Sequence, residues 1–290
     1  MAALTRGYPL SWTSLLSSIR PGDQVFTGIH ENSAGERSFI GQICQSPRLP
    51  NAQLNYFITP EGAERRELTL LLEGLIREAG LWGTTQVLAE LTTDSEFFPE
   101  FRQAGFSVLA KQHLYRFDNP GEIQSDLEGR WRIWNSDDIP AMRRLYLTLV
   151  PPLIQPVEPL TRLERLGLIY YEPSGGLQAF ADLVYGPVGI WILPFVHPQS
   201  AVDPACLLRQ ILADLSDLAG RPVYVVARSY QPWVETALEH LEGLCGQEQI
   251  LMVRHLAIRQ RIKADLAFKP LDNGNTEPSI PIATAKSNGK

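Results

Sequence analysis

The sequence predicts an α+β fold built from two tandem copies of one unit. Residues 53–117 and 188–259 each show a strand, a long amphipathic helix, a second strand, a short aromatic helix and a closing strand. The composition agrees, because 44% of the 290 residues are hydrophobic and 20% are charged, which suits two cores of roughly 130 residues each. We therefore expect each copy to form a mixed twisted sheet flanked by helices.

The first copy is centred on an amphipathic helix expected at residues 67–79. Five aliphatic side chains recur there at helical spacing, namely Leu68, Leu71, Leu72, Leu75 and Ile76. The expected elements, in order, are a helix at 12–19, strands at 24–30, 38–45 and 53–59, the helix at 67–79, a strand at 86–91, a short helix at 96–104 and a strand at 107–117.

The second copy opens with a strand at residues 131–134 and a helix that Ser136 is expected to cap, next to two carboxylates that suit a helix start. Pro151 and Pro152 end that helix. The remaining expected elements are a short helix ending at residue 166, strands at 167–171, 177–185 and 188–196, a helix at 204–219, a strand at 223–227, a short helix at 232–241 and a closing strand at 249–258.

Polar segments rich in proline and glycine divide the chain. The predicted division is an N-terminal domain at 1–118, a linker at 119–129, a C-terminal domain at 130–262 and a tail at 263–290. The tail has few large apolar side chains, so we expect it to be disordered. The two domains are expected to pack as an intrachain pseudo-dimer.

Composition and motifs exclude several classes of protein. A formal net charge of -6 gives no overall attraction to nucleic acid or to an anionic membrane, so neither is an expected partner. Cys44, Cys206 and Cys245 are far apart, and no histidine or cysteine spacing indicates a metal site. No signal peptide, membrane-spanning run, phosphate-binding Walker loop or dinucleotide fingerprint is found, which favours a cytoplasmic protein.

Two motifs carry a family resemblance. Residues 131–142, Trp-Arg-Ile-Trp-Asn-Ser-Asp-Asp-Ile-Pro-Ala-Met, resemble the opening strand, cap and first helix of the GNAT fold of acyl-CoA N-acyltransferases. Gly105-Phe106, after the aromatic run at 97–101, resembles the late helix and turn of that family. Together the similarities cover nearly all of residues 10–260, as two degenerate tandem copies.

The resemblance implies a wedge between two parallel strands that takes the pantetheine arm of acetyl-CoA, with the pyrophosphate at the start of the following helix. In the first copy the corresponding loop offers Gly62, Ala63, Arg65 and Arg66 as the cofactor-binding residues. The two arginines can equally be solvated charges at an exposed helix start. The second copy has no glycine in this loop, and an aspartate and a proline stand at its helix start.

The resemblance also implies a base for the attacking amine and an acid for the leaving thiolate. Glu90, on the strand after the first long helix, is the expected base, with Asp94 as an alternative. Tyr230 is the nearest candidate acid. Each also has an ordinary structural explanation. Glu90 can be a solvent-facing strand residue, Asp94 a helix cap and Tyr230 a packing residue.

Three functions follow from these patterns. The first is an acyl-CoA-dependent N-acyltransferase that moves an acetyl group from acetyl-CoA to an unknown amine, on a small molecule or a protein. The second is a catalytically silent tandem module that binds a small ligand or a protein partner. The third is a chiefly structural pseudo-dimer. Stabilisation by acetyl-CoA distinguishes the first from the other two.

Overall fold

The computed structural model describes residues 24–31, 38–46, 49–60, 62, 64–118, 129–160, 166–172, 175–215 and 220–256. The expected helix at 12–19, most of the linker, the short helix before residue 166 and the tail lie outside these residues. None of the helices in these ranges is long and apolar enough to cross a membrane.

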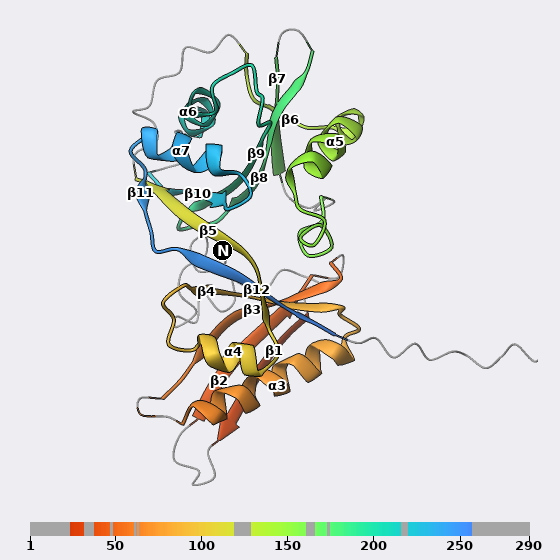
Figure 1. The fold of residues 1–290 in the computed structure, drawn as a ribbon, viewed down its shortest axis with the longest axis vertical. Helices are drawn as coiled ribbons and strands as arrows, with labels where there is room; N and C mark the ends of the chain where they lie inside the picture. Colours follow the sequence, from red (N-terminus) through yellow and green to blue (C-terminus); the bar gives the residue numbers. More distant parts are fainter. Residues whose placement is uncertain are drawn as a thin grey trace, which may run out of the picture. The chain divides into compact units, whose positions relative to one another are not determined.

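The first copy follows the predicted order of elements (Figure 1). They are β1 (Gln24–Glu31), β2 (Ser38–Gln45), β3 (Asn51–Ile58), α3 (Arg65–Leu81), β4 (Gln86–Thr92), α4 (Phe98–Gln103) and β5 (Ser107–Phe117). We call these elements the first half.

The second copy repeats the order after a short opening strand. Its elements are β6 (Arg132–Ile133), the 3-10 helix η2 (Ser136–Asp138), α5 (Ile139–Leu149), β7 (Leu166–Tyr171), β8 (Leu177–Tyr185), β9 (Ile190–Val196), α6 (Pro204–Asp214), β10 (Val223–Arg228), α7 (Pro232–His240), β11 (Leu244–Cys245) and β12 (Gln249–His255). We call them the second half. The α+β class and the repeated order of elements are thereby confirmed.

The cap that starts the second half differs from the expected one. Asn135, not Ser136, caps the helix, because its side chain accepts a hydrogen bond from the backbone N–H of Asp137 at 2.9 Å. Asp138 completes a capping box by accepting from the backbone N–H of Asn135 at 2.8 Å. The guanidinium of Arg132 also donates one hydrogen bond to each carboxylate oxygen of Asp138, at 2.7 and 2.8 Å. These bonds lower the pKa of the Asp138 carboxyl.

The closing strands of the two halves are exchanged within one sheet. Across the described residues the strand order is β1-β2-β3-β4-β12-β5-β10-β9-β8-β7-β6, with β11 paired to β5. Thus β12, from the end of the second half, lies between β4 and β5, where Leu251 is paired with both Glu90 and Ala110. In return β5 pairs with β10 of the second half, with Tyr115 opposite Val225. The sequence did not predict this exchange.

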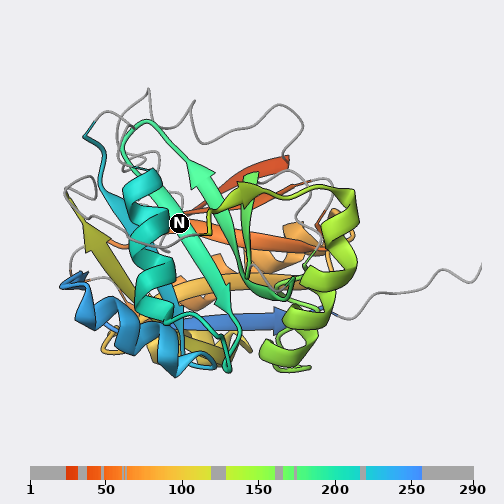
Figure 2. The ribbon, with the colours of Figure 1, turned by 90° about the horizontal axis from the view of Figure 1, so that it is seen from above.

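Helices cover both faces of the second half (Figure 2). On one face α6 and α7 bury a cluster that includes Leu208, Ile211 and Val225. On the other face α5 packs Leu145 and Tyr146 over a different set of strand residues. In the first half, α3 and α4 cover one face of β1 to β4.

Two glycines let α3 lie close to the first-half sheet. A β-carbon built at Gly41 would stand 2.7 Å from the Cδ1 atom of Leu75, and one at Gly28 would stand 3.1 Å from its Cδ2 atom. Leu75 is 2% exposed and has little room to move. The strand glycines therefore fix the distance between helix and sheet.

We expect Gly41→Val to lower the free energy of unfolding by about 1 to 3 kcal/mol, because it overpacks the contact with α3. The matched control is Gly74→Ala on the exposed side of the same helix, where an added β-carbon meets nothing within 4 Å. That change should raise the free energy of unfolding by about 0.5 to 1 kcal/mol. Urea unfolding measures both, and equal effects would contradict the close approach.

Candidate functional site

The first half contains a pair of parallel strands that diverge. β3 and β4 are paired only at Asn51 with Gln86, Ala52 with Val87 and Gln53 with Leu88. Beyond these pairs β3 continues to Ile58 and β4 to Thr92, without each other as partners. We call this opening the first gap. It has the form of the wedge that the sequence resemblance implied.

The second half repeats the divergence. β9 and β10 are paired only at Ile190 with Val223, Trp191 with Tyr224 and Ile192 with Val225. β9 then runs on to Val196 and β10 to Arg228. We call this opening the second gap.

The side chain of Gln231 fills the second gap. Its Oε1 atom accepts from the backbone N–H of Val196 at 3.1 Å, and its Nε2 atom donates to the carbonyl of Pro194 at 3.0 Å. Gln231 is fully buried, and Trp233 donates to the carbonyl of Val196 at 3.0 Å. Side chains therefore hydrogen-bond the backbone N–H and carbonyl groups of β9 that no longer pair with β10.

The helix start beside the second gap is also occupied. Asp203 accepts a hydrogen bond from the backbone N–H of Ala205 at 2.8 Å, and Pro204 removes one donor. A carboxylate thus already stands where an anion would bind. This agrees with the absence of a glycine loop in the second copy.

The helix start beside the first gap is different. Glu64, at the N-cap of the 17-residue helix α3, makes no side-chain capping hydrogen bond. Gly62, just before it, is exposed and has a φ of 66°, a conformation that suits glycine. Arg66 is exposed on the first turn, while Ala63 lies outside the described residues. Within the described part of this loop, the side chain of Glu64 therefore does not cap the first turn, and the carboxylate of Glu67 in that turn is paired with His30.

Arg65 turns toward α4. Its guanidinium donates to the carbonyl of Glu96 at 3.1 Å and lies 3.7 Å from the carboxylates of both Glu96 and Glu100. Glu100 is 4% exposed, and its Oε2 atom has no hydrogen-bond partner. Arg65 therefore offsets the charge of a buried carboxylate, whereas Arg66 is exposed at the helix start.

Aromatic rings join the two sides of the first gap on the helix-covered face. The ring of Phe57, at the end of β3, lies 5.3 Å from that of Phe97 and 5.5 Å from that of Phe101. Phe97 and Phe101 belong to the segment that follows β4. This face of the gap is consequently apolar.

A buried charged cluster lies among the central strands. Arg228, at the end of β10, donates to the carboxylate of Glu158 and to the side-chain oxygen of Gln112 on β5. Arg228 is 3% exposed and Glu158 is 4% exposed. Tyr230 donates to the other carboxylate oxygen of Glu158 at 3.4 Å.

The charge of Glu90 also acts on this cluster. Burial alone would lower the pKa of Arg228, but the acidic groups of Glu158, Tyr230 and Glu90 outweigh it and raise that pKa. We call Glu90, Glu158, Arg228 and Tyr230 the central cluster. Glu90 and Tyr230, the expected base and acid, thus both act on the charge of Arg228, although β12 and β5 lie between β4 and β10. Gly62 and Arg66 lie at the start of α3. Asp94 is exposed on the loop after β4.

Glu158, Arg228 and Gln231 did not stand out in the sequence. Arg228 ends the otherwise apolar strand Val-Tyr-Val-Val-Ala-Arg, and a charge at the end of a buried strand is the one local signal that could have marked it. Glu158 and Gln231 lie in loops, so only the fold shows what they contact. In the described residues no group of histidine, cysteine and carboxylate side chains is arranged to hold a metal ion.

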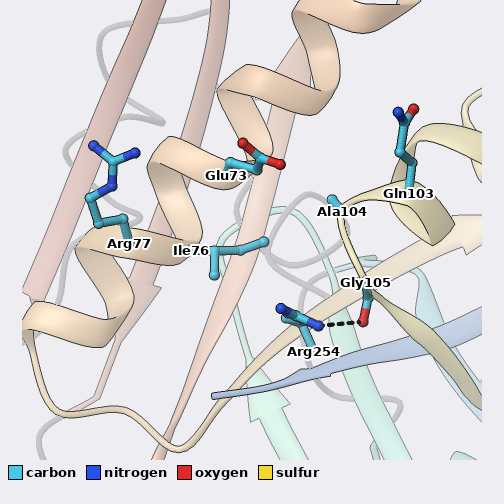
Figure 3. A pocket seen from close by; sticks show the side chains of 7 residues that line it. All are labelled: Glu73, Ile76, Arg77, Gln103, Ala104, Gly105 and Arg254. Atoms are coloured by element: carbon cyan, nitrogen blue, oxygen red, sulfur yellow. Dashed lines mark hydrogen bonds between the residues drawn. The ribbon is translucent and has the colours of Figure 1, made fainter. Parts of the chain in front are cut away.

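A cavity of about 340 Å³ lies along α3 (Figure 3). Its lining residues come from α3, the end of α4 and β12; they are Glu73, Ile76, Arg77, Gln103, Ala104, Gly105 and Arg254. Arg254 donates to the carbonyl of Gly105 at 3.4 Å, and that glycine has a φ of 83°. None of the site residues expected from the sequence lines this cavity.

Comparisons with known proteins agree with this architecture. No family model matches the sequence, and no curated protein matches it either. A conserved protein of unknown function from Staphylococcus epidermidis matches the structure with a TM-score of 0.55 and 12% identity, over 79% of this chain and 95% of that one.

Two acetyltransferase structures match as well. A GCN5-related N-acetyltransferase from Sphaerobacter thermophilus has a TM-score of 0.51 and 12% identity, over 79% of this chain and 80% of that one. One from Kribbella flavida has a TM-score of 0.51 and 10% identity, over 80% and 90%. The chain therefore has the fold of GCN5-related N-acetyltransferases. Its particular form is a pair of diverged copies that exchange their closing strands.

We expect Gln231→Leu to lower the free energy of unfolding by about 2 to 4 kcal/mol, because it leaves a buried N–H and a buried carbonyl of β9 without partners. Gln199→Leu is the matched control, since Gln199 is exposed. It should change stability by no more than about 0.5 kcal/mol. Chemical denaturation compares the two, and a small effect at Gln231 would mean that water satisfies the second gap.

Proposed function

We propose that this protein is an acyl-CoA-dependent N-acyltransferase that uses the first gap, with acetyl-CoA as the acyl donor and an unidentified amine as the acceptor. The observation that supports the first gap is the contrast between the two helix starts. The start of α3 has no side-chain cap and follows a glycine, whereas Asp203 caps α6 and Gln231 fills the gap beside it. An anionic phosphate needs N–H donors that no capping carboxylate already occupies, so of these two helix starts α3 suits it better.

The residues around the first gap have distinct proposed roles. Gly62 and the first turn of α3 would hold the pyrophosphate, and Arg66 would add a charge-assisted contact. Beyond Gln53, the edge of β3 that faces β4 would pair with the amides of the pantetheine arm, because β4 no longer pairs with it there. Acyl-CoA, when bound, supplies the activated thioester.

Glu90 is the proposed general base. It lies on β4 two residues beyond Leu88, the last residue of β4 that pairs with β3, so it stands where the gap opens. Acyl transfer forms a C–N bond to the amine and breaks the thioester C–S bond. Glu90 would take the proton that the amine loses, and Tyr230 is the proposed source of a proton for the leaving thiolate.

One observation favours the alternative of a silent binding module. Arg65 is engaged with Glu96 and Glu100, and the ring of Phe57 contacts Phe97 and Phe101 across the first gap. If these contacts persist in solution, the helix-covered face of the gap is closed to a long ligand. Binding of CoA therefore separates the two functions.

The binding test is thermal melting with CoA and acetyl-CoA. A ligand at a hundred times its dissociation constant stabilises the folded state by about 2.7 kcal/mol. We expect Arg66→Ala to weaken CoA binding roughly fivefold, and Arg65→Ala with Arg66→Ala to weaken it further. Arg143→Ala, an exposed arginine on α5, is the charge-matched control and should bind like the wild type. An unchanged melting temperature with millimolar CoA would favour the silent module.

The catalytic test is the variant Glu90→Gln. It keeps the size and hydrogen-bonding capacity of the side chain but cannot accept a proton at neutral pH. We expect it to retain CoA binding and to lower kcat by about 10²- to 10⁴-fold, measured by CoA release with a panel of amines. Full activity in this variant would assign the base to another group.

A further inference from the structure

The central cluster belongs to both halves. Glu90 lies on β4 of the first half, whereas Glu158, Arg228 and Tyr230 come from the second. Gln112 on β5, which accepts from Arg228, donates in turn to Gln249 on β12 at 2.7 Å. The cluster is therefore built across the two exchanged strands.

The segment at residues 150–158, which carries Glu158, also reaches the first gap. The side chain of Asn51 donates to the carbonyl of Val157 at 2.7 Å, and Val157 packs against Leu88 and Val253. Leu88 is the last residue of β4 that pairs with β3. Val157 therefore lies where the first gap begins, and Glu158 follows it directly.

Strand register places Glu90 and Arg228 on one face of the sheet. Arg228 on β10 lies opposite Gln112 on β5. Gln112 lies opposite Gln249 on β12, which in turn lies opposite Thr92 on β4. Glu90 is two residues from Thr92 on β4, and side chains two apart in a strand share a face. Further along that face of β4, Gln86 lies 3.5 Å from His255, at the opposite end of the strand.

The cluster contains two carboxylates and one guanidinium. Glu158 and Arg228 are almost fully buried, and a buried carboxylate without a cation nearby takes up a proton. Glu90 is half-buried, and in its protonated form it cannot accept the proton of an amine. Arg228 is the cation of the cluster in the described residues, and Tyr230 is its remaining titratable group.

We propose that Arg228 is a positioning residue which, from the second half, keeps the base Glu90 of the first half ionised and holds Glu158 and its segment beside the first gap. This inference rests on the proposed acyl transfer. It gives the second half a role in the reaction, although its own gap is filled by Gln231. Neither half alone then contains the whole central cluster.

The main test is the pH dependence of acyl transfer in Arg228→Met and Arg228→Lys. Loss of the cation favours protonated Glu90, so Arg228→Met should move the acid limb of the kcat/KM profile up by about one pH unit or more. Activity should recover at higher pH, and Arg228→Lys should restore much of the wild-type profile. A purely structural role would lower activity equally at every pH, and that result would overturn the inference.

Glu158→Gln is the opposing variant. It removes the carboxylate that competes for Arg228, so the acid limb should move down rather than up. Circular dichroism of each variant establishes that it is folded. Shifts of the same sign in Arg228→Met and Glu158→Gln would contradict the electrostatic account.

A second readout does not need activity. Without Arg228 the carboxylate of Glu158 would be buried with no cation from the cluster, so its protonated form would be favoured in the folded state and the stability of the fold would be lost as the pH rises. The melting temperature of Arg228→Met should therefore fall further below that of the wild type at pH 7 than at pH 5. A deficit independent of pH would overturn the inference. If no variant transfers acyl groups but this deficit grows with pH, the proposed function fails while the role of Arg228 in keeping the cluster ionised stands.

Discussion

The structure depends on one constraint, which is that two neighbouring parallel strands separate in each half and expose backbone groups that need partners. A buried N–H or carbonyl without a hydrogen bond is costly, so a folded protein must supply a partner or leave the edge open to solvent or ligand. In the second half the side-chain amide of Gln231 hydrogen-bonds both a backbone N–H and a backbone carbonyl of β9. In the first half neither strand beyond Gln53 and Leu88 has the other as its partner. The same divergence thus gives one opening that Gln231 fills and one in which the two strands simply stop pairing with each other.

This difference explains why the two copies have kept different sequences at their helix starts. Asp203 and Pro204 stabilise α6 as an ordinary capped helix, which is what a filled gap allows. Gly62 and the start of α3, where Glu64 makes no capping hydrogen bond, add no such stability. Their proposed role is to bind the pyrophosphate of acyl-CoA. The second half in turn contributes Arg228 and Glu158, which are buried next to the strands of the first half. If the proposed function holds, the two copies are specialised rather than redundant.

Local patterns predicted the elements well and their pairing poorly. The stripe of Leu71 and Leu75 identified α3, and the closing strand of the first copy was placed at its observed bounds, 107–117. The exchange of closing strands was missed, because β-strand periodicity states which face is buried but not which strand lies alongside. Glu90 and Tyr230 were singled out by position in the fold, and their catalytic roles stay predictions. Arg228 and Glu158 were missed because they are 70 residues apart in the chain and meet only in the folded protein.

The place of β12 in the sheet has a consequence for biosynthesis. During translation β5 leaves the ribosome roughly 140 residues, and β4 roughly 160 residues, before the strand that separates them, since Leu251 is paired with Ala110 and Glu90. Until then the nascent first copy exposes strand edges that can associate with other chains. Because such distant contacts form slowly, β12, the last strand in the described part of the chain, sets when both copies become complete. A ribosome that stops before residue 249 therefore releases two unfinished sheets rather than one finished domain and one incomplete one.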